Sequence, residues 1–433
     1  MTIAEVTLWG KSIGAVTWDN VRGVAYFEYT PEFKKSAIEL APLHMPLSNT
    51  VYSFGALNRE TFHGLPGLLA DSLPDHFGNA LIDAWLSREG IQKQDFDPVQ
   101  RLCYIGQRAM GGLEFVPIIK SAKLNYEGDV DLGALISLAN EVLAKRSSLD
   151  TSLDEFHKAQ TIKQILQVGT SAGGARAKAL IAWNPLNNKI RSGQADIKKG
   201  FEHWILKFDG IDQIQDKDVQ DPQGYGLIEY VYHLMAKASG IHMMPCHLLE
   251  ENGRSHFMTQ RFDRTDTGQK IHMQSLCAIA HLDYNQAGAH SYEQAFDVMR
   301  QINLTPEDLE QLLRRAIFNI LARNQDDHTK NIAFLMNKLG EWRLSPAYDL
   351  TYNYNSKGLW TRTHQMSING KRDDFELDDI IALGKHASLS KKRTLIILSE
   401  VKAGIDSWKQ LAEDADIKPE IIRMIQSMFR SIE

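Results

Sequence analysis

Residues 324 to 331 concentrate carboxylate, amide, imidazole and ammonium groups in the sequence Asn-Gln-Asp-Asp-His-Thr-Lys-Asn. Another acid, Asp349, follows eighteen residues after Asn331 within Ser-Pro-Ala-Tyr-Asp-Leu. Phosphoryl transfer needs a carboxylate that orients the attacking hydroxyl and accepts its proton, together with oxygen ligands for the magnesium ion that spans the phosphates. These residue types therefore predict phosphoryl-transfer chemistry.

The spacing of these residues supports the same prediction. Asp326 and Asn331 are five residues apart, which is the separation of the catalytic aspartate and the metal-binding asparagine in protein-kinase catalytic loops. Asp349 follows an expected hairpin, where kinases place a second metal ligand. The competing interpretation is a solvated loop in which Asp and Asn cap helices. Taken alone, His328 favours a structural hydrogen bond over catalysis.

A kinase also needs a cation for the nucleotide phosphates. Lys207 lies near the end of the predicted strand 204–208, and Glu229 lies on the predicted helix 225–238. A strand lysine and a helix glutamate form an ion pair in protein kinases, so these two side chains are candidates for that pair. The alternative places both on solvated surfaces.

The segment 170–178 contains Gly173-Gly174 and precedes a predicted strand. Its backbone amides could close over phosphates. It lacks the spacing of a Walker A loop, however, and a plain turn explains a Gly-Gly pair equally well.

The elements that must position these groups indicate an α+β protein. Alternating residues between 6 and 29 predict antiparallel hairpins, and further strands are expected at 113–119, 179–183 and 256–260. Helices are expected from 74 and over 131–143, and the chain after 263 is mostly helical apart from a hairpin at 332–344. We expect a two-lobed kinase-like fold, with an N-terminal α/β part and a mainly helical C-terminal lobe. The predicted units are an N-terminal α/β subdomain (1–150), nucleotide-binding strands with a phosphate loop (151–264), and a helical C-terminal lobe with the catalytic loop (265–433).

Composition excludes several other classes of protein. No apolar run reaches the length of a membrane span and no signal peptide is present, so we expect a cytoplasmic protein that does not contact membrane. The three cysteines, Cys103, Cys246 and Cys277, are far apart and suggest neither a disulfide framework nor a thiolate zinc site. The formal net charge of −6 argues against the whole chain being a nucleic-acid binder. Contact with DNA is therefore expected mainly through a partner.

Over most of its length the chain resembles the HipA-type serine/threonine kinases, which are toxins of bacterial toxin-antitoxin pairs. Besides the 324–331 segment and Asp349, the resemblance rests on residues 67–78 (GLLADSLPDHFG), 171–180, 238–241, 260–264, 272–274 and 342–350.

The resemblance implies that ATP and Mg²⁺ bind between the two parts. It makes Asp326 the catalytic aspartate, and Asn331 and Asp349 the metal ligands. It also makes Ser171 an autophosphorylated serine whose modification inhibits the enzyme. The nucleotide contacts that it implies come from Lys178, Lys207, Gln260, Phe262, His328, Lys330 and Tyr348. The chain departs from the family in having Arg176-Ala177 before Lys178, where a Gln-Glu pair is frequent, and Gln260 where a glutamate is common.

The resemblance further implies an inhibitory partner, a HipB-like helix-turn-helix antitoxin that carries most of the operator-DNA contacts. Glutamyl-tRNA synthetase, the substrate of the best-known relatives, is a candidate protein substrate that nothing in this sequence selects. Two other classes remain open. One is a catalytically degenerate binding partner of a DNA-bound repressor. The other is a metal-dependent hydrolase that uses His328 with Asp327, although His364 and His386 have no spacing that recommends them as further ligands.

Overall fold

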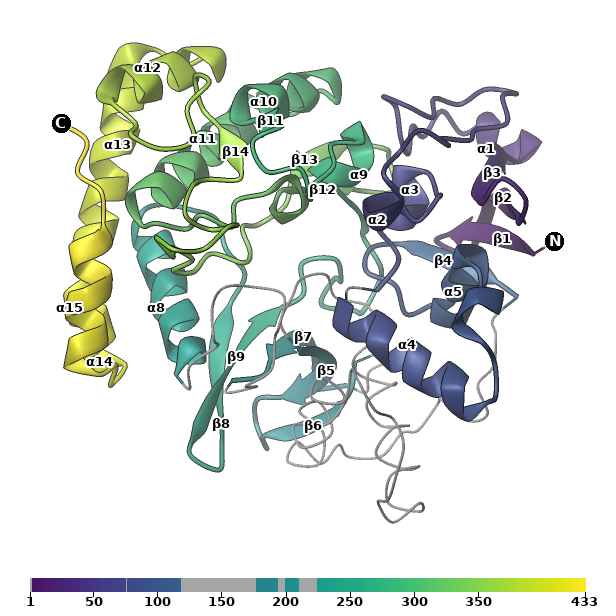
Figure 1. Ribbon diagram of the computed structural model, residues 1–433, viewed down its shortest axis with the longest axis horizontal. Coiled ribbons are helices and arrows are strands. Elements are labelled where there is room, and N and C mark those ends of the chain that lie inside the picture. Colours follow the sequence, from purple (N-terminus) through teal and green to yellow (C-terminus); the bar gives the residue numbers. More distant parts are fainter. Residues whose placement is uncertain (1, 75, 118–176, 194–198, 210–223) are drawn as a thin grey trace.

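The computed structural model describes residues 2–74, 76–117, 177–193, 199–209 and 224–433. Figure 1 shows three parts side by side: an N-terminal sheet with short helices on the right, a second sheet below the centre, and a helical lobe on the left. The predicted boundary near residue 150 and the predicted helix over 131–143 lie outside the described residues.

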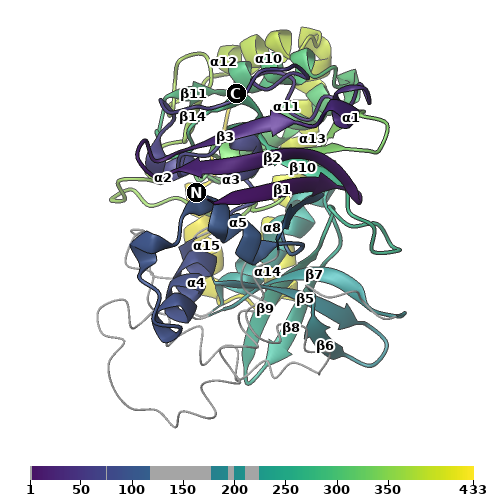
Figure 2. The ribbon, with the colours of Figure 1, turned by 90° about the vertical axis from the view of Figure 1, so that its right-hand side faces the viewer.

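The N-terminal part is built on an antiparallel sheet with the strand order β3-β2-β1-β4. Ala4, Val6 and Leu8 are buried on one face of β1 while Ile3 and Glu5 are exposed on the other, which is the alternation expected of a half-buried strand. The predicted hairpins are confirmed, and Figure 2 shows β1, β2 and β3 face on. The elements of this part are β1 (Ile3–Leu8), β2 (Lys11–Asp19), β3 (Val24–Tyr29), α1 (Pro31–Lys34), α2 (Arg59–Phe62), α3 (Gly67–Ala70), α5 (Pro98–Ile105) and β4 (Leu113–Val116).

The second sheet is antiparallel and has the order β6-β5-β7-β9-β8. The predicted helix from residue 74 is present as α4, and its Leu81, Ile82 and Trp85 belong to the same hydrophobic core as this sheet. The strands predicted at 179–183, 204–208 and 256–260 are present, whereas β6 and β8 were not predicted. The elements are α4 (His76–Arg88), η1 (Lys93–Asp95), β5 (Lys178–Asn184), β6 (Lys189–Ser192), β7 (Glu202–Lys207), β8 (Cys246–Glu251) and β9 (Arg254–Gln260).

The C-terminal lobe packs helices around one core in which α8, α11, α13 and α14 meet. The hairpin predicted around residues 337–340 is present as β12 and β13, and β10 extends it to three strands. The elements are α8 (Tyr225–Ala238), β10 (His272–Ser275), α9 (Leu276–Ala280), β11 (His290–Ser291), α10 (Tyr292–Gln301), α11 (Pro306–Leu321), η2 (Thr329–Asn331), β12 (Ala333–Met336), β13 (Trp342–Leu344), β14 (Met366–Ser367), α12 (Leu377–His386), α13 (Lys391–Asp406), α14 (Trp408–Asp414) and α15 (Pro419–Met428).

The N-terminal part is fixed to the C-terminal lobe through α3 and α9. The Asp71 carboxylate accepts hydrogen bonds from the backbone N–H and the hydroxyl of Ser275, at 2.7 and 2.8 Å. Gly67 lies so close to α9 that a Cβ there would meet the Ala278 carbonyl oxygen at 2.2 Å, so only glycine permits this contact. Because α9 also contacts η2, this joint supports the segment that carries the polar residues.

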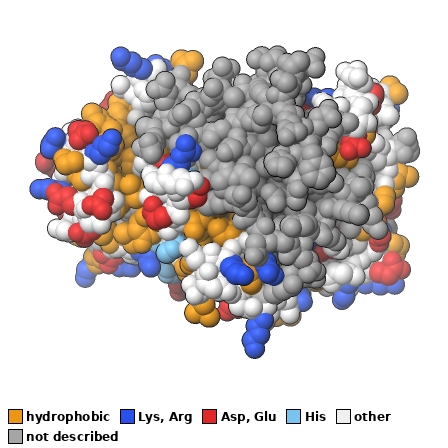
Figure 3. Space-filling view, turned by 90° about the horizontal axis from the view of Figure 1, so that it is seen from below, with side chains coloured by type: hydrophobic (Ala, Val, Ile, Leu, Met, Phe, Trp, Pro, Cys, Tyr) orange, Lys and Arg blue, Asp and Glu red, His pale blue; other side chains and the backbone are white. Residues whose placement is uncertain are grey.

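Two surface findings concern the described residues alone. None of their helices combines the length and apolarity that crossing a membrane requires. On the face shown in Figure 3, the described acidic and basic side chains are interspersed instead of gathering into one basic area.

Candidate active site

Lys207, the last residue of β7, is enclosed between two carboxylates. Its side chain is nearly buried, and Nζ donates hydrogen bonds to Glu229 on α8 and to Asp349. Burial opposes the charge of Lys207, but Asp349 and Glu229 raise its pKa above the ordinary value. The expected pairing of Lys207 with Glu229 is therefore present, and the ammonium group is ionised.

Glu229 reaches Lys207 because α8 lies tightly against the second sheet. Asp209 accepts hydrogen bonds from the backbone N–H groups of Gly224 and Gly226, and so satisfies donors at the start of the helix. A Cβ on Gly226 would lie 2.1 Å from the Ser255 carbonyl oxygen, so a larger residue would push α8 away from β9. The helix thus holds the buried Glu229 over the end of β7.

Asp349 comes from the segment that follows the β12–β13 hairpin. It has a left-handed backbone conformation, with φ of 53°, which aspartate tolerates better than most residues. The backbone N–H of Ala347 donates to the His242 carbonyl at 2.8 Å and fixes the segment beside the end of α8. Burial alone would raise the pKa of Asp349, but Lys207, with further help from Lys178 and His328, lowers it well below its usual range.

The predicted catalytic loop follows α11 and is closed by its own side chains. Asn331 Nδ2 donates to the Asp326 carbonyl oxygen at 2.8 Å, so the five-residue spacing makes a compact loop. On the carboxylate of Asp326, Oδ1 accepts a hydrogen bond from Trp360 Nε1 at 2.7 Å and lies 3.8 Å from His328 Nε2. His328 also acts electrostatically on Asp349 and lowers its pKa, so it influences both acids.

Asp327, the neighbour of Asp326, is buried in a separate network. Its carboxylate accepts hydrogen bonds from the Tyr292 hydroxyl at 2.9 Å and the Gln365 backbone N–H at 2.8 Å, and pairs with His364 Nδ1 at 2.9 Å. It therefore anchors the catalytic loop to α10 and to the segment before β14. The hydrolase interpretation paired Asp327 with His328, and that pair is not formed. Within the described ranges, no group of three His, Cys, Asp or Glu side chains could hold a metal ion.

Three of the remaining predicted nucleotide contacts, Lys178, Tyr348 and Phe262, have contacts that relate them to this cluster. Lys178 begins β5, is buried, and lies directly opposite Lys207 in the strand register. Tyr348 donates its hydroxyl hydrogen to the Lys330 carbonyl oxygen at 2.7 Å, which ties the Asp349 segment to the catalytic loop. The Tyr348 ring also lies 5.6 Å from the ring of Phe262, two residues beyond Gln260, the end of β9.

The side chain of Lys330, another predicted nucleotide contact, lies over an aromatic ring. Its Nζ lies 5.2 Å from the centre of the Tyr284 ring, and the same ring is 5.2 Å from His328. Tyr284 follows α9, so this contact links the catalytic loop to the joint with the N-terminal part.

The donor set fits magnesium and a polyphosphate. Asp349 would supply a carboxylate oxygen, and Asn331 keeps its amide oxygen for a ligand because Nδ2 is already used. Oxygen ligands of this kind are those that magnesium prefers, while Lys207 and Lys178 would supply positive charge for phosphate oxygens.

One predicted site residue lies outside the described part of the chain, and two residues of the site were not predicted. Ser171 lies outside the described residues, so its expected modification stays a prediction. The roles of Trp360 and Asp327 were not predicted, because sequence spacing gives no signal for a contact between segments some 35 residues apart.

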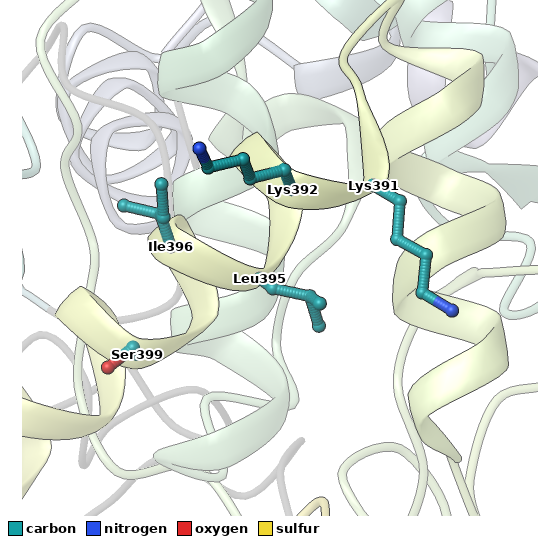
Figure 4. Close-up of a pocket in the computed structure, with 5 residues that line it drawn as sticks. All are labelled: Lys391, Lys392, Leu395, Ile396 and Ser399. Carbon is teal, nitrogen blue, oxygen red and sulfur yellow. The ribbon is translucent and has the colours of Figure 1, made fainter.

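A separate hollow on α13 is lined by Lys391, Lys392, Leu395, Ile396 and Ser399 and contains none of the predicted site residues (Figure 4).

Comparison with known families covers most of the chain. A family model described as the HipA N-terminal domain matches residues 4–116, and one described as the HipA-like C-terminal domain matches residues 170–429. A curated protein from Sinorhizobium fredii named Putative kinase Y4mE is 29% identical over 125 residues. That alignment covers 27% of this chain and 30% of the relative, so the chain spans less than a third of that protein.

The solved structure of HipA from Shewanella oneidensis MR-1, in complex with HipB and its operator DNA, matches 99% of this chain and 92% of that one. The TM-score is 0.61 at 17% sequence identity, which shows a common fold. The kinase CtkA of Helicobacter pylori matches 52% of this chain and 92% of its own, with 12% identity and a TM-score of 0.30. With the whole-chain match, the expected two-lobed α+β fold is confirmed.

Proposed function

The chain belongs to the HipA family, and from this premise we propose that it is an ATP-dependent kinase that phosphorylates serine or threonine in a protein. The observation that carries the proposal is the buried Lys207 held between Glu229 and Asp349. Nothing in simple core packing calls for a lysine and two acids at this place, and burying such a set is costly. A kinase needs a lysine–glutamate pair and a metal-binding aspartate together.

Each residue has a distinct part in the proposed reaction. Asp326 orients the substrate hydroxyl and accepts its proton, which is the role of the aspartate in a kinase catalytic loop. Asn331 and Asp349 would hold Mg²⁺, which neutralises charge on the phosphates when the nucleotide is bound. Lys207, fixed by Glu229, contacts phosphate oxygens. The further nucleotide contacts in this proposal are Lys178, His328, Lys330, Tyr348, Gln260 and Phe262.

Family membership supports a proposal for the regulation and the partners. We propose that a HipB-like antitoxin binds and inhibits the chain and carries most of the operator-DNA contacts, as a toxin-antitoxin pair requires. The Shewanella oneidensis relative was solved with HipB and operator DNA, which supports this proposal. Autophosphorylation of Ser171 would inhibit the enzyme. Glutamyl-tRNA synthetase is the first protein substrate to test.

The test is mass spectrometry of the purified protein after incubation with Mg·ATP, together with a measurement of ATP turnover. Asp326→Asn should stay folded and lose at least about a hundredfold in phosphoryl transfer, the lower end of what a positioned general base contributes. Asp406→Asn, at an exposed position at the end of α13, is the matched control and should keep full activity.

Near-normal phosphorylation by folded Asp326→Asn would refute the catalytic assignment. ATP binding by the wild type without any turnover would instead favour a degenerate member of the family that acts as a binding partner.

A further inference from the structure

The indole of Trp360 makes a direct contact with the proposed catalytic base. Trp360 Nε1 donates to Asp326 Oδ1 at 2.7 Å, within the range of a good hydrogen bond to a carboxylate. The two residues are 34 positions apart in sequence. An indole N–H can only donate, so this group cannot receive the proton of a substrate hydroxyl. Its effect must be exerted on the carboxylate of Asp326.

The segment that carries Trp360 is anchored to the catalytic loop. The buried side-chain amide of Gln365 donates to the Trp360 carbonyl oxygen and, at 3.3 Å, to the Gln325 carbonyl oxygen. The backbone N–H of Gln365 donates to Asp327. These contacts connect the segment to the two residues that flank Asp326, so the indole cannot shift far without disturbing them.

The other end of the segment is held in the same way. The Asn353 backbone N–H donates to the Arg323 carbonyl oxygen at 3.2 Å, and Asn353 Nδ2 donates to Asn324 Oδ1 at 3.2 Å. Both partners lie just before the catalytic loop. A segment fixed at both ends is suited to holding a side chain in place, and less suited to swinging away as a removable plug.

We propose that Trp360 is a positioning residue that fixes the rotation of the Asp326 carboxylate, so that its second oxygen faces the substrate hydroxyl. This inference rests on the proposed kinase function. Rotation about the side-chain torsions of an aspartate moves each oxygen by more than an ångström, and a misplacement of about 1 Å can cost on the order of a hundredfold in rate. One oxygen held by a fixed donor removes that freedom.

The first experiment measures kinetics of Trp360→Phe, which keeps an aromatic ring but removes the donor. We expect kcat to fall by about tenfold to a hundredfold, with the KM for ATP changed by less than about twofold, because binding of the nucleotide is untouched. Trp9→Phe is the matched control. The half-buried Trp9 also donates its indole N–H, to the Lys270 carbonyl oxygen at 2.9 Å, but lies in the N-terminal part, so its kcat should be unchanged.

The second measurement asks whether Trp360 acts through Asp326. In an Asp326→Asn background, Trp360→Phe should cause little further loss, because residues that act as a unit are not additive. An equal loss in both backgrounds would mean a merely structural role and would overturn the inference. Wild-type or higher activity of Trp360→Phe would also overturn it, the latter because the indole would then be blocking the base.

A spectroscopic test separates this inference from the proposed function. The indole N–H resonance of Trp360, identified by its absence in Trp360→Phe, should move upfield in Asp326→Ala when the carboxylate acceptor is removed. A resonance that does not respond, in a protein that phosphorylates normally, would refute the inference alone. Failure of the wild type to transfer phosphate would refute the proposed function. It would also refute the proposed role of Trp360 in the reaction, whether or not the indole resonance shifts.

Discussion

The cluster of Lys207, Glu229 and Asp349 leads to a prediction about protein stability. Glu229→Gln should lower the free energy of unfolding of the wild type but raise that of a variant that lacks Lys207. One cation and two carboxylates give the cluster a net charge of −1. Replacing Glu229, which is 2% exposed, by Gln preserves its shape and leaves Lys207 paired with Asp349. Replacing Lys207 by Met instead leaves the buried Glu229 and the half-buried Asp349 without this cation.

The expected magnitudes follow from these partners. Glu229→Gln replaces the charged acceptor of the Lys207 ammonium by a neutral amide oxygen, so the free energy of unfolding should fall by about 1 to 2 kcal/mol. Lys207→Met should lower it by about 3 to 5 kcal/mol, the cost of leaving a buried charge uncompensated. In the Lys207→Met background, Glu229→Gln removes the more deeply buried of the two charges that Lys207 had neutralised. There it should raise the free energy of unfolding by about 1 kcal/mol or more.

Urea unfolding of the four proteins near neutral pH, followed by circular dichroism, measures these differences. Glu413→Gln is the control, because Glu413 is half-exposed and 3.9 Å from Lys409; it should change the free energy by less than about 0.5 kcal/mol. If Glu229→Gln destabilises both backgrounds equally, the two carboxylates do not share one cation and the description of the cluster is wrong.

Four further predictions concern the metal, pH, modification and DNA. Asp349→Asn should weaken the dependence of phosphoryl transfer on Mg²⁺, because a charged ligand is lost; an unchanged magnesium titration would count against this role. Burial, with a smaller contribution from His44, lowers the pKa of His281 to about 3. Between its ordinary pKa and this lowered value, His281 binds a proton in the unfolded chain but not in the folded protein. The free energy of unfolding should therefore fall as pH drops from about 6.5 toward about 3. His281→Asn should flatten that part of a stability–pH curve, and an unaltered slope would exclude His281 as a source. Peptide mapping after incubation with Mg·ATP should find phosphate on Ser171, and label confined to other residues would contradict this. The modified protein should also bind ATP more weakly, since about two added negative charges would repel the nucleotide. The isolated chain, with its net charge of −6, should bind operator DNA poorly without a HipB-like dimer, and tight, salt-sensitive binding by the chain alone would be the contrary result.

Features that depend on neighbours in the chain were predictable. The five-residue spacing of Asp326 and Asn331 is that of a kinase catalytic loop, and a hydrogen bond joins these two residues. The residues between 332 and 344 indicated a hairpin, because a turn sequence joins two short apolar runs. Helix α4 showed its buried face through residues one turn apart, Leu81 and Trp85. In each case the interacting groups are held near one another by a short length of chain.

Pairings between distant segments were not predictable in this way. Strand β4 completes the N-terminal sheet by pairing Leu113 with Leu8 of β1, which is about a hundred residues away in sequence. The four residues of β4 do not indicate which strand it pairs with. The partners of Asp327 likewise come from α10 and from the segment before β14. Sequence alone left Asp327 as a possible metal ligand, whereas its burial shows an anchoring role.

By itself, then, the sequence determined which chemistry was available: the acids, the amide and the lysine, with the loop spacing of a kinase. Only the tertiary structure decided that Glu229 and Asp349 share Lys207, and that Trp360 lies on Asp326. The physical reason is that covalent spacing limits residues only over short lengths of chain. Over longer lengths, the position of a side chain is set by how whole helices and strands pack, and each such contact depends on all the others.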